Sequence, residues 1–95
     1  MREIIYSRHL KERLELRELP YDLPLQIYER PTERYRDLAT KLSVAIGKSA
    51  YRGRIREFAV VYRETEDVIT LVTIHPVKPR QKLSRLRQGR WQPLP

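Results

Sequence analysis

Apolar and polar residues alternate through the middle of the chain, which is the pattern expected of half-buried β-strands. Residues 42–51, LSVAIGKSAY, place branched apolar residues on one side of a strand and small residues on the other. Gly53 lies in YRGR, which predicts a tight turn. The return strand is predicted over residues 55–64, IREFAVVYRE. Together these segments predict an antiparallel hairpin.

Residues 68–75, VITLVTIH, are apolar on both alternating faces. A strand buried on both faces is expected to be central in its sheet and covered by helices. Pro76 has no N–H to donate, so it is expected to end the strand. His75 would then lie at the rim of the sheet, on the same face as Ile69 and Leu71. A histidine at a rim is expected to keep a pKa of about 6.5.

The first third of the chain predicts a short strand followed by two helices. REIIY is a β-like run, and Ser7 can cap a helix over residues 8–19 that Pro20 ends. A second short helix is predicted over residues 23–30, because Pro24 fits its first turn.

A weak strand over residues 33–39 precedes the hairpin, and the tail predicts a short basic helix through Leu83 and Leu86 that ends at Gly89. The predicted order is therefore β-α-α-β-β-β-α. This order indicates a single α+β domain over residues 1–95, with an antiparallel sheet, helices on one face and a basic tail from about residue 78.

The composition adds a strong basic bias. The 95 residues include 20 Lys and Arg against 12 Asp and Glu, a net charge of +8, and arginines outnumber lysines. Arginine suits bidentate phosphate contacts, so the charge favours a polyanion: nucleic acid first, then an acidic protein, then an anionic membrane surface. The alternative is that the charge serves solubility alone. With no cysteine, disulfides and thiolate zinc sites are excluded, and without an apolar run of signal-peptide or membrane-spanning length we expect a soluble cytoplasmic protein.

The first predicted helix carries basic residues on its core-facing half. His9, Arg13 and Arg17 follow one another at intervals of four residues on that half. The leucines of the same half are Leu10, Leu14 and Leu16. In one interpretation the basic stems pack on the edge of the core and their heads reach water or a carboxylate such as Glu29 or Asp37. In the other, the heads line a groove beside the sheet and bind phosphate.

Further basic residues lie in the hairpin and in the tail. Arg52, Arg54 and Arg56 alternate along the hairpin and would share one face, either as a binding surface or as charges that protect an edge strand. The tail holds six basic residues and no acidic one: Lys78, Arg80, Lys82, Arg85, Arg87 and Arg90. Trp91, beside them, either stacks on a base or closes the core.

Patterns of known catalytic sites are scarce. The chain has no P-loop, no Gly-rich dinucleotide turn, no HExxH and no pattern for a metal or a cofactor. His75, Lys78, Tyr62 and the arginines remain. These groups suit metal-independent cleavage of RNA, in which a base takes the 2′-OH proton and cations stabilise the charge on phosphorus. The alternative role for His75 is a structural bond from the strand end to a backbone carbonyl.

The order of elements and several segments resemble the RelE/ParE-like superfamily of small toxins, including its BrnT-like members. The resemblance covers nearly the whole chain: the opening strand, SRHLKERLELREL, YRGRIREFAVVY, and VTIHPVK before the basic terminal helix. It implies a curved antiparallel sheet with two N-terminal helices packed on it. It also implies cleavage of mRNA, often ribosome-bound mRNA, and neutralisation by an antitoxin, for which an acidic protein is expected.

The resemblance also suggests site residues. The positions that match the family's cleavage residues are Arg54, Arg56, Tyr62, His75 and Lys78. The residues expected to bind nucleic acid are His9, Arg13, Arg17, Arg52, Arg85, Arg87, Arg90 and Trp91.

Two functions of different classes are consistent with these residues. The first is a toxin-like endoribonuclease that uses no metal or cofactor, with His75 as general acid or base. The second is a non-catalytic module on the same fold, whose arginines hold a nucleic acid or an acidic protein. In either case we expect a monomer or a dimer in isolation.

Overall fold

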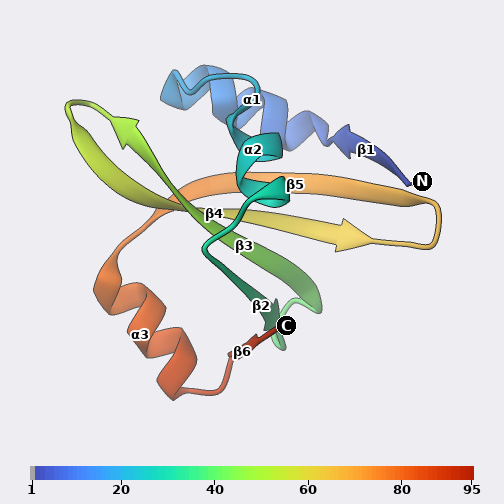
Figure 1. Ribbon diagram of the computed structural model, residues 1–95, viewed down its shortest axis with the longest axis vertical. Coiled ribbons are helices and arrows are strands. Elements are labelled where there is room, and N and C mark those ends of the chain that lie inside the picture. The colour runs from blue at the N-terminus through green and yellow to red at the C-terminus, as the bar shows by residue number, and fades with distance from the viewer. Residues whose placement is uncertain (1) are drawn as a thin grey trace.

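The computed structural model describes residues 2–95. In this part of the chain six strands form one mixed sheet and three helices pack on it, so the fold is α+β (Figure 1). The elements are, in chain order, β1 (Glu3–Tyr6), α1 (Arg8–Arg17), α2 (Leu23–Glu29), β2 (Glu33–Asp37), β3 (Leu42–Tyr51), β4 (Arg54–Glu64), β5 (Val68–Val77), α3 (Pro79–Arg87) and β6 (Trp91–Pro93).

The sheet has the strand order β1-β5-β4-β3-β2-β6. β1 runs parallel to β5, whereas the other four pairs are antiparallel. The prediction of a purely antiparallel sheet is therefore wrong at β1, because a parallel pair joins segments far apart in the chain and leaves no local signal. β6 is absent from the predicted order, since it has only three residues and ends in a proline.

The helices lie on both faces of the sheet, not on one as predicted. On the α1–α2 face, Leu10 and Leu14 belong to a core that includes Phe58 of β4. On the opposite face, which we call the α3 face, Leu86 packs against a second core that includes Trp91. In Figure 1, α1 runs beside β5 while α3 stands on the other side of the sheet.

Several local predictions are confirmed. β3 has the bounds that its alternating pattern predicts. The tight turn is present, with positive φ at Arg52 (51°) and Gly53 (78°). The side chain of Ser7 caps α1 by accepting the backbone N–H of Leu10 at 3.0 Å. Leu16, in contrast, is 71% exposed, so the prediction that it faces the core is wrong.

An irregularity in β5 determines where His75 points. Two consecutive residues of β4 pair with Leu71 and Thr73, so Val72 is an extra residue in β5. One extra residue exchanges the faces of all side chains that follow it. His75 consequently pairs with Ala59 and faces the α3 side, whereas Leu71 faces the α1–α2 side. The prediction that His75 and Leu71 share a face is therefore wrong.

Pro76 lies inside β5, opposite Phe58, and does not end the strand as predicted. β1 pairs only with Val68–Leu71, so the second half of β5 has no strand on its outer side. A free edge tolerates proline because no neighbouring strand needs its N–H.

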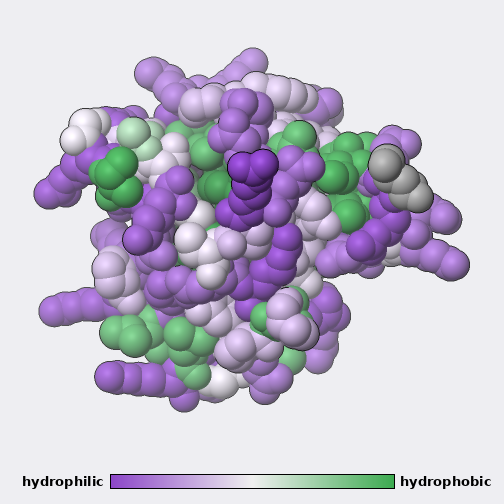
Figure 2. Space-filling view, in the orientation of Figure 1, coloured by the Kyte–Doolittle hydropathy of each residue, from purple (hydrophilic) through white to green (hydrophobic). Residues whose placement is uncertain are grey.

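The surface is mainly polar. Figure 2 shows hydrophilic residues over most of one face, with smaller hydrophobic patches between them. None of the helices within residues 2–95 has the length and apolar character needed to cross a membrane.

Candidate functional site

His75 lies on the half of β5 that β1 leaves uncovered. Burial lowers the pKa of its imidazole below the ordinary 6.5, and the charges of Arg85, Arg17 and Arg13 lower it further, in that order. The expectation of an ordinary pKa is therefore wrong, and the lowered pKa favours the neutral imidazole. No hydrogen bond within residues 2–95 contributes to this shift, so the structural role, a bond to a backbone carbonyl, has no support there.

The three arginines whose charges lower the pKa of His75 come from two helices on opposite faces of the sheet. Arg13 and Arg17 come from α1, which runs beside β5, and Arg85 comes from α3. We call His75, Arg13, Arg17 and Arg85 the His75 cluster. The sequence predicts each of its members as a binding or catalytic residue, but it places Arg85 in a basic tail, because its position over Trp91 depends on the packing of α3.

Two members of the cluster have buried N–H groups without an acceptor. The Nε atoms of Arg17 and Arg85 are buried and make no hydrogen bond within residues 2–95. No salt bridge in that part of the chain involves Arg13, Arg17 or Arg85. Of the two partners expected for the heads of Arg13 and Arg17 in the structural interpretation, the carboxylate is therefore wrong, and water stays a prediction. An unpaired buried cationic N–H is costly.

Other basic residues of the tail are neutralised inside the protein. Arg90 donates to Asp37 at 3.1 Å, and Nζ of Lys82 lies 3.0 Å from Glu33 and 3.1 Å from Glu57. Burial alone would lower the pKa of Lys82, but these two carboxylates outweigh burial and raise it. Arg90 and Lys82 thus attach the C-terminal segment to the sheet, and Nε of Arg90 is held by Asp37.

Trp91 closes the core, which is one of its two predicted roles. It is 3% exposed, stacks on Tyr35 at a centroid distance of 5.4 Å, and donates its ring N–H to Asp37 at 3.1 Å. The guanidinium of Arg85 lies 5.4 Å from the centre of the Trp91 ring. The buried ring is thus available to position Arg85 rather than to stack on a base.

Tyr62 and His75 lie on opposite faces of the sheet. It is 1% exposed on the α1–α2 face, and its hydroxyl accepts a hydrogen bond from Arg34 at 2.9 Å. Tyr28 packs edge-on against it at 4.9 Å. The predicted grouping of Tyr62 with His75 is wrong, because the extra residue in β5 puts the two rings on opposite faces.

The arginines of the hairpin are also separate from His75. Arg54 and Arg56 alternate with Phe58 and so face the α1–α2 side. Arg52 lies in the turn, 5.1 Å from the ring of Tyr51. Lys78 is exposed at the start of α3 and does not contribute to the pKa shift of His75. The predicted catalytic group is therefore divided between two faces of the sheet.

The two remaining predicted contacts are His9 and Arg87. His9 is exposed and accepts a hydrogen bond from Nε of Arg13 at 3.4 Å. Arg87 lies on the outer side of α3, in a shallow hollow of about 430 Å³. The other residues that line this hollow are Arg80, Leu83, Ser84 and Gln88.

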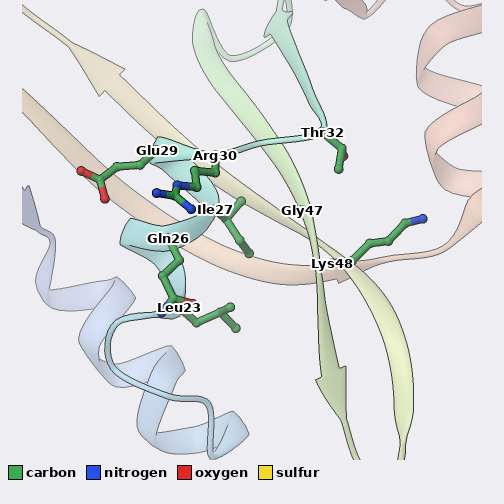
Figure 3. Close-up of a pocket in the computed structure, with 8 residues that line it drawn as sticks. All are labelled: Leu23, Gln26, Ile27, Glu29, Arg30, Thr32, Gly47 and Lys48. Atoms are coloured by element: carbon green, nitrogen blue, oxygen red, sulfur yellow. The ribbon is translucent and has the colours of Figure 1, made fainter.

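A larger hollow, of about 610 Å³, lies between α2 and β3 (Figure 3). Its apolar wall is formed by Leu23 and Ile27, and Glu29 and Arg30 lie at the end of α2. Figure 3 shows that Lys48 points away from these two charged residues. The polar groups of this hollow do not converge on one point, and they carry charges of both signs. Within residues 2–95, moreover, no three His, Cys, Asp or Glu side chains form a group that could hold a metal ion.

The resemblance to RelE/ParE-like toxins stays a prediction from the sequence. Comparison of the chain with family models, with curated proteins and with solved structures finds no match in any of the three. The His75 cluster is thus the arrangement from which a function is inferred.

Proposed function

We propose that this protein binds RNA through phosphate groups held by Arg13, Arg17 and Arg85, and that it cleaves the bound RNA at His75 without a metal. The observation that carries the proposal is that Arg17 and Arg85, which have no carboxylate partner within residues 2–95, both lower the pKa of His75 by their charge. The net charge of +8 supports a polyanionic partner. The toxin-like sequence pattern favours RNA among polyanions, with an acidic antitoxin as a second partner.

The chemistry requires a base and a stabiliser of negative charge. Neutral His75 would accept the proton of the 2′-OH, and the 2′ oxygen would attack phosphorus. The bond from phosphorus to the 5′ oxygen would break, and that oxygen would take a proton from water. The products are a 2′,3′-cyclic phosphate and a 5′-hydroxyl. The arginines would stabilise the additional charge on the phosphate oxygens in the transition state.

A second candidate function is RNA binding without cleavage. It is favoured by the separation of Tyr62 from His75, which leaves the His75 cluster with one side chain suited to exchange protons near neutral pH. In this case the same arginines hold the phosphates, and no bond is broken.

A binding and cleavage assay separates the two candidates. The full chain is mixed with end-labelled RNA in EDTA, and the wild type is compared with His75→Asn, Arg17→Ala and Arg85→Ala. Each Arg→Ala variant is expected to weaken RNA affinity by roughly tenfold, the effect of one charge-assisted hydrogen bond. Arg8→Ala is the matched control, because Arg8 is exposed on the same helix α1 and pairs with Glu12.

The outcomes are distinct. Cleavage by the wild type in EDTA, lost in His75→Asn with affinity retained, supports the nuclease. Cleavage that survives His75→Asn places the reaction elsewhere. Binding without cleavage by the wild type supports the second candidate. Equal loss of affinity in Arg8→Ala and Arg17→Ala would show that only net charge matters and would refute the site.

A further inference from the structure

The end of β3 is an edge of the sheet that no strand within residues 2–95 covers. β2 pairs with β3 only from Leu42 to Ile46, whereas β4 accompanies β3 as far as Tyr51. Residues 47–51, which we call the β3 edge, therefore have a neighbouring strand on the β4 side alone. An uncovered edge presents its backbone N–H and C=O groups as a template for another strand.

The pairing of β2 determines which backbone groups of the β3 edge are free. Arg34 of β2 accepts the N–H of Leu94 at 2.9 Å on its β6 side, so the preceding residue of β2 directs its backbone groups to its partner Ile46 on β3. Backbone groups alternate between the two sides of a strand. Lys48 and Ala50 therefore direct their N–H and C=O groups to the same side as Ile46, past the end of β2.

The chain leaves the β3 edge at Thr32. The backbone N–H and the hydroxyl of Thr32 both donate to the C=O of Ile46, at 2.8 and 3.1 Å, and the chain before Thr32 belongs to the connection from α2. Thr32 also lines the hollow of about 610 Å³ beside α2, together with Gly47 and Lys48 of the β3 edge. A strand added here would continue the position of β2 in the sheet.

The two faces of the β3 edge differ in character. On the α1–α2 face Gly47 has no side chain, and Leu23 and Ile27 of α2 form an apolar wall that points towards β3 (Figure 3). Glu29, the one acidic residue among those that line the hollow, points away from β3 in the same view. On the α3 face Lys48 is exposed. Successive side chains of an added strand would therefore alternate between the apolar wall and Lys48.

Charge determines which strand fits this edge. Residues 47–56, from the β3 edge through the turn into β4, include four basic residues and no acidic one. None of the four forms a salt bridge within residues 2–95; they are Lys48, Arg52, Arg54 and Arg56. A second copy of the edge would bring two such groups of cations together, so self-pairing is disfavoured. An acidic segment is attracted instead.

We propose that a partner protein adds an acidic, extended segment to the β3 edge, with apolar side chains towards Leu23 and Ile27 and acidic side chains towards Lys48. Backbone hydrogen bonds would supply affinity, and the alternation of side chains would supply specificity. RNA could use the cations but not the apolar wall, so a peptide fits the surface better. The inference goes beyond the proposed function, because no member of the His75 cluster lines this hollow.

The test uses the full-length protein and a synthetic hexapeptide of alternating valine and glutamate, acetylated and amidated at its ends. A hexapeptide of alternating valine and lysine is the matched control. NMR follows the amide signals of Lys48 and Ala50 and the rate of their hydrogen exchange. We expect the glutamate peptide to shift both signals and to slow both exchange rates several-fold, because pairing removes the amides from water. The lysine peptide should bind several-fold more weakly.

Two proline substitutions test the pairing itself. Ala50→Pro removes a free N–H from the β3 edge, and Ile55→Pro removes one from β4, opposite Ala50, where the pairing with β5 has not yet begun. Proline is tolerated at an edge whose N–H faces solvent, so both variants should fold, as urea denaturation will show. Ala50→Pro should weaken binding of the glutamate peptide by roughly tenfold, whereas Ile55→Pro should leave it unchanged.

A charge reversal tests the same surface without changing the backbone. Lys48→Glu should reverse the preference, so that the lysine peptide binds more tightly than the glutamate peptide. Arg87→Glu, an equal change of charge at an exposed position of α3, should keep the wild-type preference.

The outcomes that overturn the proposal are distinct. Absence of glutamate-peptide binding at millimolar concentration would refute it, as would equal binding by the wild type and a folded Ala50→Pro. Protection of the two amides that grows with protein concentration alone would identify a second copy as the occupant. Protection by an RNA hexamer but not by the peptide would assign the surface to RNA. Failure of RNA binding or cleavage at the His75 cluster would refute the proposed function and leave the peptide result standing.

Discussion

The guanidinium of Arg85 lies 5.4 Å from the centre of the Trp91 ring, and the same ring donates its N–H to Asp37 at 3.1 Å. Asp37 is 5% exposed and also accepts the backbone N–H groups of Ala39 and Thr40. A buried carboxylate thus holds a buried indole, and the indole in turn supports one arginine of the His75 cluster. The contacts from Asp37 to Trp91 and from Trp91 to Arg85, which we call the relay, connect the loop after β2 with the candidate site.

The relay predicts different effects for two substitutions of Trp91. Trp91→Leu removes both the π face and the N–H, so it should weaken RNA affinity several-fold and lower the free energy of unfolding by roughly 3 kcal/mol. Trp91→Phe keeps a π face, so it should retain most of the affinity while losing about 1–2 kcal/mol of stability with the bond to Asp37. RNA binding and urea denaturation measure the two effects. Equal loss of affinity in both variants would show that Arg85 does not depend on the ring.

The ion cluster around Lys82 is expected to keep α3 on the sheet. Lys82→Met would leave Glu33 and Glu57 partly buried without their cation, which should cost roughly 1–3 kcal/mol of the free energy of unfolding. Because Arg85 is carried by α3, RNA affinity should fall as well. Adding Glu57→Gln removes one of the unpaired charges, so the double variant should recover part of the stability. Urea denaturation of the single and double variants measures this, and no recovery would contradict the role of Glu57.

Gly47 predicts a steric limit between β3 and α2. A Cβ atom at this position would lie 2.8 Å from Cγ1 of Ile27, which is closer than carbon atoms tolerate. Gly47→Ala should therefore cost roughly 1–3 kcal/mol, the usual cost of overpacking a core. Ile27→Val removes only the δ methyl group and keeps Cγ1, so it should relieve little, whereas Ile27→Ala removes the clashing atom. Thermal unfolding measures the stability of Gly47→Ala alone and together with Ile27→Ala. A Gly47→Ala variant as stable as the wild type would contradict the clash.

The sequence predicts local elements well where one pattern fixes them. The alternation in residues 42–51 determines β3, and the cap at Ser7 and the turn at Gly53 depend on neighbouring residues only. The sequence does not predict which face of the sheet each side chain of β5 takes. The extra residue at Val72 is set by pairing with β4, which no pattern within VITLVTIH reveals, and it moves His75 to the other face.

The residues of the candidate site could be named from the sequence, but the sequence did not show which of them lie together in the fold. Arg13, Arg17, Arg85 and His75 stand out by their charge and position, yet Tyr62, Arg54 and Arg56 stand out equally. The difference lies in which face each side chain takes and in whether an acid lies near it. Both depend on tertiary packing: α3 crosses to the face opposite α1, and the carboxylates of Asp37, Glu33 and Glu57 neutralise Arg90 and Lys82 instead.

Asp37 predicts a loss of stability in acid. Burial alone would raise the pKa of its carboxyl, but bonds from Arg90, Thr40 and Trp91 outweigh burial and lower it below the ordinary 3.8. A lowered pKa means that the ionised form stabilises the folded state above about pH 4, and that this contribution is lost as the pH falls through the folded pKa. Asp37→Asn should thus be less stable than the wild type at pH 7 and closer to it at pH 2–3. Denaturation curves across this range measure the difference, and a constant difference would contradict it.

His75 predicts a second pH dependence, at higher pH and with a separate cause. Its pKa is lowered in the folded protein by burial and by Arg85, Arg17 and Arg13, so the unfolded chain binds more protons near pH 6. The free energy of unfolding should therefore fall as the pH drops from about 6.5 towards the folded pKa of His75, and level off below it. His75→Asn cannot titrate and should lose this step while keeping the acid step of Asp37. Urea denaturation from pH 5 to pH 8 tests this, and a step of equal size in His75→Asn would assign it to another group.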